Sequence, residues 1–242
     1  MEEERQMKTL ENFKLTLRYH DKLNPKIWDG NKLKSEISTK LKLIAKKWAE
    51  YANIPNKVIK DVILVGGNAN FNYTRFSDLD LHLVVDQSDI ANCPDLLDDY
   101  LRDKKQLWSF THDIKIYGHD VELYAQDVSA PYPKGQGVYS IKQNKWLVEP
   151  KKENVTFTKD AFLQRKIKDY MDQIDYLIDN NADEEEFKKL KKKFRDMRSS
   201  SIQKGGEFSF ENLIFKDLRN RGYFDKMNEY IKKSEDERLS LK

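Results

Sequence analysis

The chain has 242 residues and a formal net charge of only +3 at pH 7, with 44 lysines and arginines against 41 aspartates and glutamates. This balance excludes a general electrostatic attraction to nucleic acid, so any basic surface must be local. The single cysteine, Cys93, excludes an internal disulfide, and no apolar segment approaches the roughly 18 to 20 residues of a transmembrane helix. With no secretory signal either, we expect a cytoplasmic protein of one large or two small domains.

The N-terminal part predicts an arm followed by a helix. Residues 10–23 are amphipathic, and Trp28 is expected to dock this arm onto the core. Residues 32–51 carry apolar side chains at helical spacing with lysines between them, which predicts one apolar stripe packed against a sheet. Pro55 separates this helix from the first predicted strand.

Residues 61–86 contain two predicted strands joined by a tight turn. Residues 62–65 form a short aliphatic run, and Gly66 and Gly67 end it where the backbone must turn sharply or approach a ligand closely. A polar and aromatic segment follows, and residues 79–85 then form a second apolar run.

Two acids open this second strand. Because side chains alternate along a strand, Asp78 and Asp80 share one face, within about 7 Å of each other, while three leucines share the other face. Two ionised carboxylates so close repel each other unless a cation lies between them, and hard oxygen ligands favour magnesium or manganese. The alternative is that Asp78 caps the loop and Asp80 points to solvent. His82 shares the acidic face and is interpreted as a hydrogen-bonded neighbour rather than a base.

A second hairpin, predicted over residues 113–126 around Gly118, supplies a third acid. Glu122 lies between apolar neighbours, where a carboxylate is costly to ionise unless it is paired or metal-bound. If its strand lies beside residues 79–85, Glu122 completes a three-carboxylate site able to hold two cations. Asp120 is the competing acid, but its place beside the turn favours a turn residue.

The remaining chain predicts further helices. Pro94 begins one that extends to about residue 110, and a loop at residues 130–137 precedes a small hairpin. From about residue 158 the alternation gives way to helical spacing, so residues 151–242 are expected to form a C-terminal helical domain.

The pattern of an apolar strand, Gly-Gly, a polar loop, Ser77 to Leu81 and a distant Glu122 resembles the nucleotidyltransferase superfamily, which includes DNA polymerase beta, poly(A) polymerases and antibiotic nucleotidyltransferases. The segments most similar to small predicted nucleotidyltransferases of bacteriophages are GGNANFNYTRFSDLDLHLVVD, YHDKLNPKIWDGNKLKSEI and GGEFSFENLIFKDLRNRGY. One departure is Gly67, where many members have serine.

The resemblance implies an α+β fold, with a mixed-sheet nucleotidyltransferase core, helices on one side of the sheet and a C-terminal helical bundle. It implies that residues 1–150 form the catalytic domain with its N-terminal helical arm. The implied reaction moves an NMP from an NTP to an acceptor hydroxyl, with Mg²⁺ or Mn²⁺ as cofactor. The implied catalytic and metal-binding residues are Asp78, Asp80 and Glu122, and the implied nucleotide-binding residues are Gly66, Gly67, Asn68, Ser77 and Lys204.

The acceptor and the partners are left open. An RNA or tRNA end is favoured, because loop aromatics at Phe71, Tyr73 and Phe76 can stack bases and a run of seven basic residues between Lys188 and Arg198 can bind a phosphate backbone. That run can equally be a solvated helix face. The alternatives are transfer to a protein or small molecule, oligonucleotide signal synthesis, and a non-catalytic binding module. If the chain is phage-encoded, it is expected in the host cytoplasm.

Overall fold

A computed structural model describes residues 13–90, 94–132, 134–155, 157 and 160–241, and its chain divides into two compact units. One unit is Tyr19–Glu153, here the sheet unit. The other, here the helical unit, comprises residues 154–241 together with residues 13–18. Among the described residues, no helix is both long and apolar enough to span a bilayer. Cys93 lies outside the described residues.

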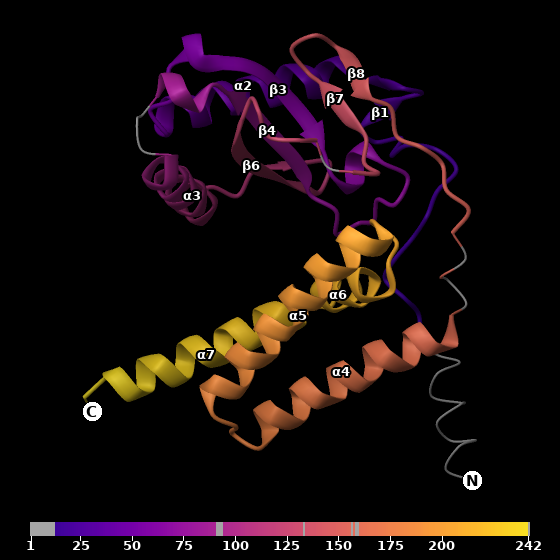
Figure 1. Ribbon diagram of the computed structural model, residues 1–242, viewed down its shortest axis with the longest axis vertical. Coiled ribbons are helices and arrows are strands. Elements are labelled where there is room, and N and C mark those ends of the chain that lie inside the picture. The colour runs from indigo at the N-terminus through magenta and orange to yellow at the C-terminus, as the bar shows by residue number, and fades with distance from the viewer. Residues whose placement is uncertain (1–12, 91–93, 133, 156, 158–159, 242) are drawn as a thin grey trace. The chain divides into compact units, whose positions relative to one another are not determined.

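The sheet unit is built on a mixed six-stranded sheet, so the α+β class is confirmed (Figure 1). Strands β4 and β6 pair in parallel, and every other neighbouring pair in this sheet is antiparallel. The strand order is β5-β6-β4-β3-β7-β8. The strands are β3 (Ile59–Val65), β4 (Leu79–Val85), β5 (Lys115–Ile116), β6 (His119–Asp127), β7 (Val138–Ser140) and β8 (Lys145–Val148), with a separate pair β1 (Trp28–Asp29) and β2 (Lys32–Leu33).

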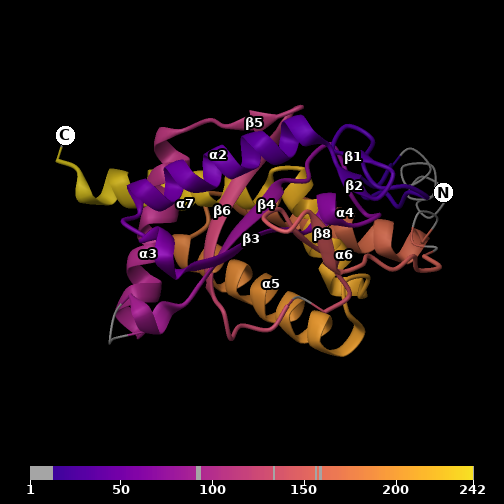
Figure 2. The same cartoon turned by 90° about the horizontal axis from the view of Figure 1, so that it is seen from above.

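Two helices pack in the main hydrophobic core with one face of this sheet, here called the closed face. Helix α2 (Ser35–Tyr51) lies alongside the sheet in Figure 2, and α3 (Pro94–Thr111) begins at the expected proline. Helix α2 buries its predicted stripe in the same cluster that contains the three leucines of β4. Helix α3 contributes Leu97, Leu101 and Trp108, whereas Leu96 and Leu107, which were also expected to be buried, are exposed. The residues at the centre of this cluster are Ile37, Leu41, Trp48, Leu79, Leu81, Leu83, Leu101 and Leu123. The predicted alternation along β4 is therefore confirmed on its apolar side.

The opposite face of the sheet, here the open face, carries Asp80, His82, Glu122 and Tyr124. These residues face one another in register across β4 and β6. Only a small apolar cluster lies farther along the same face, formed by Ile63, Val65, Val84 and Val138. Short 3₁₀ turns connect the strands: η1 (Asn56–Val58), η2 (Gly67–Ala69) and η3 (Gln87–Asp89). The open face of the sheet thus carries polar side chains beside a small apolar cluster.

The described residues of the helical unit form four helices around their own aromatic and aliphatic core. Asp160 caps the first helix by accepting a hydrogen bond from Leu163 N–H at 3.0 Å, and Asp183 caps the second in the same way. The helices are α4 (Ala161–Asp179), α5 (Glu184–Gly205), α6 (Phe210–Asn220) and α7 (Tyr223–Leu239). The wholly or almost wholly buried residues include Ile167, Phe187, Phe194 and Leu218.

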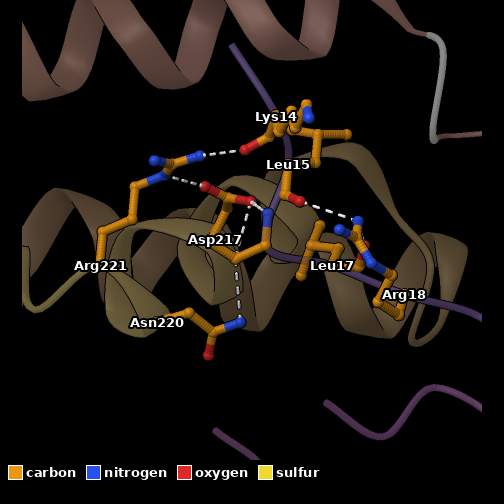
Figure 3. Close-up of polar contacts among 8 residues, drawn as sticks. Lys14, Leu15, Leu17, Arg18, Asp217, Asn220 and Arg221 are labelled. Carbon is orange, nitrogen blue, oxygen red and sulfur yellow. Dashed lines mark hydrogen bonds and ion pairs between the residues drawn. The ribbon is translucent and has the colours of Figure 1, made fainter. Parts of the chain in front are cut away.

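The N-terminal arm is held in the helical unit by one buried carboxylate. Asp217 is fully buried and accepts hydrogen bonds from the backbone N–H of Thr16 at 2.7 Å and from its hydroxyl at 2.9 Å. Arg221 Nε lies 2.5 Å from the same carboxylate and its guanidinium also bonds to Lys14 O (Figure 3). Residues 13–18 thus differ from the expectation that placed the arm with residues 1–150. The described part of the arm here contains no helix, and its extended backbone needs these side-chain partners.

We expect Asp217→Ala to lower the free energy of unfolding of the helical unit by about 3 kcal/mol, because it leaves buried donors and Arg221 without their acceptor. Asp172→Ala is the matched control, since Asp172 pairs with Lys168 but its side chain is 62% exposed. That control should cost under about 0.5 kcal/mol. Urea unfolding followed by far-ultraviolet circular dichroism measures both, and equal losses would contradict the assignment.

Candidate functional site

The sheet brings two of the three expected acids directly opposite each other. Asp80 of β4 is the register partner of Glu122 of β6 in the parallel pair, and Asp78 immediately precedes β4. The strand that contains Glu122 therefore lies beside β4, as the three-carboxylate expectation required. Alternation along the extended chain places Asp78 on the same side as Asp80.

Gly66 is shaped around the Asp80 carboxylate. Its φ is +78°, and a Cβ at this position would lie 1.7 Å from Asp80 Oδ2. No side chain fits there unless Asp80 moves, and the backbone conformation itself favours glycine. The first glycine of the motif is thus explained by the acid fourteen residues later, which neighbours it because Val65 and Asp80 are register partners.

Ser77 stands against the second glycine. A Cβ on Gly67 would lie 3.0 Å from Ser77 Oγ, a tight contact that a larger residue would have to relieve. The hydroxyl of Ser77 accepts the N–H of Thr74 at 2.8 Å, which closes the loop before β4. A serine hydroxyl that accepts one bond can still donate its own proton. Ser77 therefore keeps a donor that a phosphate oxygen can use.

Asn68 has a structural role through its side chain. It is fully buried, and its Nδ2 donates to the backbone carbonyls of Ser77 at 3.0 Å and Asp78 at 2.9 Å. Its Oδ1 accepts from Asn24 Nδ2 at 2.8 Å. These bonds fasten the turn after β3 to the entry of β4. The nucleotide contact expected of Asn68 is confined to its backbone N–H, because the side chain is used by the scaffold.

His119 and Asn24 complete this buried brace, and the sequence argument did not identify either. Asn24 Nδ2 lies 3.0 Å from His119 Nε2, and His119 Nδ1 lies 2.6 Å from Ser77 O. Since an amide nitrogen only donates, Nε2 accepts from Asn24 and Nδ1–H donates to Ser77 O. Trp28 adds a bond from Nε1 to Asn68 O at 2.7 Å, which agrees with the expected docking of the arm. The available signal was a histidine at the first position of the strand, directly after Gly118.

Glu122 occupies a different environment from the one that its apolar neighbours suggested. Its side chain is 48% exposed, and its Oε2 lies 3.0 Å from Lys105 Nζ of α3. The competing acid, Asp120, is instead 2.5 Å from Lys115 beside the turn. Glu122 alternates with buried Leu123 on a strand whose other face is open, which explains its exposure.

The carboxylate oxygens of Asp78, Asp80 and Glu122 are hard ligands of the kind that magnesium and manganese ions prefer. Across the described ranges, however, no three Asp, Glu, His or Cys side chains are gathered closely enough to hold a metal ion. Glu122 is paired with Lys105 in this structure. The carboxylates therefore lie on one face of the sheet but do not converge on a common point.

His82 lies one pair farther along the open face and has the expected neighbour role. Its Nδ1 is 2.7 Å from Gln126 Oε1, and its ring lies 5.2 Å from that of Tyr124. Burial lowers the pKa of His82, while the hydrogen bond to Gln126 and the charge of Glu122 act in the opposite direction and Lys105 lowers it further. A neutral His82 therefore donates to Gln126.

The expected basic residues belong to the helical unit. Lys204 lies in the last turn of α5, where a cation is favoured by the helix dipole. Three of the seven basic residues in the run along α5 form ion pairs within their own helix or with α7, which supports the solvated-face interpretation for these three. The ion pairs are Lys188 with Glu184, Glu185 and Glu235, Lys189 with Glu186, and Lys192 with Asp196.

A hollow of about 590 Å³ lies within the helical unit, at the turn between α4 and α5 and along α7. Acidic side chains outnumber basic ones in its lining, so it does not suit a polyphosphate. The charged residues of the lining are Asp183, Glu184, Glu185, Glu237, Lys233 and Arg238.

Gly66→Ala is expected to lower the free energy of unfolding of the sheet unit by about 2 kcal/mol more than Gly118→Ala. Gly118 is the matched control because its φ is +87° but nothing lies within 4 Å of the place that a Cβ would take, so it shares the backbone strain without the clash. All four tryptophans lie in the sheet unit, so urea unfolding followed by their fluorescence reports on it. Equal costs for the two variants would disprove the close approach of Asp80.

The lowered pKa of His82 predicts a pH dependence of stability. Between the folded value and the ordinary value near 6.5, the unfolded chain binds the proton more readily. The free energy of unfolding should therefore fall as the pH is lowered from 7.5 to 5.5, and this slope should be smaller in His82→Gln. The same fluorescence measurement at several pH values tests this, and an unchanged slope would argue against it.

Comparison of the chain with protein-family models, with curated proteins and with solved structures found no match. The motif resemblance to nucleotidyltransferases therefore rests on the sequence alone. Three features of the structure bear on it: the Gly66–Asp80 contact, the Asp80–Glu122 register and the open face that carries them.

Proposed function

We propose that this chain is a metal-dependent nucleotidyltransferase that moves an NMP from an NTP to an acceptor hydroxyl. The observation that supports it most is the placement of Asp80 against Gly66 and opposite Glu122 on the open face of a mixed sheet. The Asp80 carboxylate fits in its place because residue 66 is glycine, so the motif defines the position of this carboxylate. A solvent-pointing strand acid has no such requirement.

In this proposal Asp78 and Asp80 bind the divalent cation that accompanies the nucleotide, and Glu122 completes the set. The cations, when bound, neutralise the triphosphate and lower the pKa of the acceptor hydroxyl. Glu122 is exposed and is placed to accept the proton of that hydroxyl. The Asn68 side chain holds the backbone of Ser77 and Asp78, so it fixes where these acids begin.

The phosphate oxygens are bound by donors at the turn after β3. Gly67 and Asn68 begin η2, and the first N–H groups of a helical turn lack partners within the turn. Gly67 carries no side chain that would block a ligand, and Ser77 adds its hydroxyl. These groups all come from one loop, so a change in that loop should affect nucleotide binding more than acceptor binding.

We still propose an RNA or tRNA end as the acceptor, but fewer of the expected aromatic residues are available to stack on its bases. Phe71 is buried and Tyr73 stacks on His20 at 3.9 Å between ring centroids, so these rings serve the loop itself. Phe76 is exposed, with the Arg75 guanidinium 4.5 Å from its ring centroid. An exposed ring beside a guanidinium suits a stacked base and its phosphate. Transfer to a protein or small molecule remains the alternative acceptor class.

Two observations favour a second candidate, a non-catalytic module that binds a nucleotide or a partner. Glu122 is paired with Lys105, and the described side chains do not form a three-residue metal cluster. A module of this kind would bind nucleotide but transfer none.

Incubation with each radiolabelled NTP, Mg²⁺ or Mn²⁺ and total cellular RNA or protein tests the proposal. We expect metal-dependent label in the wild type and at least about a 100-fold loss in the double variant Asp78→Asn, Asp80→Asn. Asp113→Asn is the control, because Asp113 is an exposed acid of the same unit paired with Lys115. Its label should match that of the wild type.

The position of the label on a gel identifies the acceptor class. Equal labelling by the double variant and the wild type would refute the assigned acids. No label in the wild type, together with measurable nucleotide binding, would favour the binding module.

A further inference from the structure

We infer that Lys105 is the cation that binds the triphosphate at this site, and that it is held on Glu122 until nucleotide arrives. The inference rests on the proposed function and names a residue that the motif comparison did not include. It adds to the expected Lys204 a lysine of the sheet unit that lies beside a site carboxylate.

The backbone of Lys105 is anchored by its helix, while its ammonium is carried on a long, flexible side chain. Leu101 and Trp108, one turn on either side in α3, are buried in the core with the closed face. The Lys105 side chain reaches from this helix to Glu122, remains 30% exposed, and its Nζ lies 6.0 Å from the ring centroid of Tyr124. A flexible four-carbon stem on an anchored helix allows the ammonium to change partners without moving the fold.

The charge of the loaded site requires such a group. Three carboxylates and a triphosphate together carry more negative charge than two divalent cations neutralise. A lysine ammonium supplies a compact positive charge and three donors, which suits phosphate oxygens. The pair with Glu122 is partly exposed and therefore contributes little stability, so exchanging it for phosphate costs little.

Lys115 of β5, the strand that pairs with β6, lacks this freedom to change partners. Lys115 lies 2.5 Å from both Asp113 and Asp120, so two carboxylates already hold its charge. Lys105 is placed on a carboxylate that the proposed function itself uses. Lys115→Met therefore serves as the matched control for Lys105→Met.

Isothermal titration with ATP, GTP, CTP and UTP, each with Mn²⁺, with the corresponding monophosphates, and with Mn²⁺ alone tests the inference. We expect Lys105→Met to weaken binding of the preferred triphosphate about tenfold, the loss of one charge-assisted contact. Monophosphate binding should change less than about twofold, since the contact is to the outer phosphates. Lys105→Arg should retain most of the triphosphate affinity, and Lys115→Met should behave as the wild type.

Two other outcomes overturn the inference in distinguishable ways. If Lys105→Met binds triphosphate as the wild type does while Mn²⁺ alone binds more tightly, Lys105 is only a counter-ion of Glu122. If the wild type binds neither a triphosphate nor Mn²⁺, the proposed function itself fails. The fluorescence unfolding midpoint of each variant confirms that its sheet unit is folded.

Discussion

The contact between the Asp80 carboxylate and Gly66 is the constraint on which the sheet unit's candidate site depends. The carboxylate fills the place that a Cβ of residue 66 would take. Only glycine at residue 66 therefore allows the turn after β3 to lie against the first residues of β4. The antiparallel register of β3 and β4 fixes this approach, and the parallel register of β4 and β6 then sets Glu122 beside Asp80. The two registers thus place the two acids on one face, and the close packing contact requires glycine at residue 66.

A buried network of polar side chains holds the loop that makes this contact. Asn68, Asn24 and His119 satisfy one another and the carbonyls of Ser77 and Asp78. Buried polar groups are costly when unpaired, so these residues specify a single arrangement of the loop rather than merely stabilising it. Of the acids themselves, Asp78 and Asp80 are half-buried and Glu122 is exposed. This separation of scaffold groups from reactive groups is what the proposed enzyme requires, because the loop must not rearrange when charge is added.

The helical unit depends on a different buried charge. Asp217 holds residues 13–18 through Thr16 and Arg221, and this interaction joins chain segments about 200 residues apart in the sequence. Three of the seven basic residues in the α5 run are ion-paired within this unit, whereas Lys105 of the sheet unit is paired with a carboxylate of the candidate site. The charge needed by the proposed reaction is thus found on the same unit as its carboxylates.

Local pattern alone determined much of this protein, because alternation and helical spacing depend only on neighbours in the chain. The faces of β4, the apolar stripe of α2, the start of α3 at Pro94 and the hairpin carrying Glu122 all followed from the sequence. The partners of individual polar groups did not, since they come from distant segments. Only the tertiary structure decided that Lys105 meets Glu122, that the Asn68 side chain is a brace, and that residues 13–18 join α6, because packing rather than spacing selects which charges and amides become neighbours.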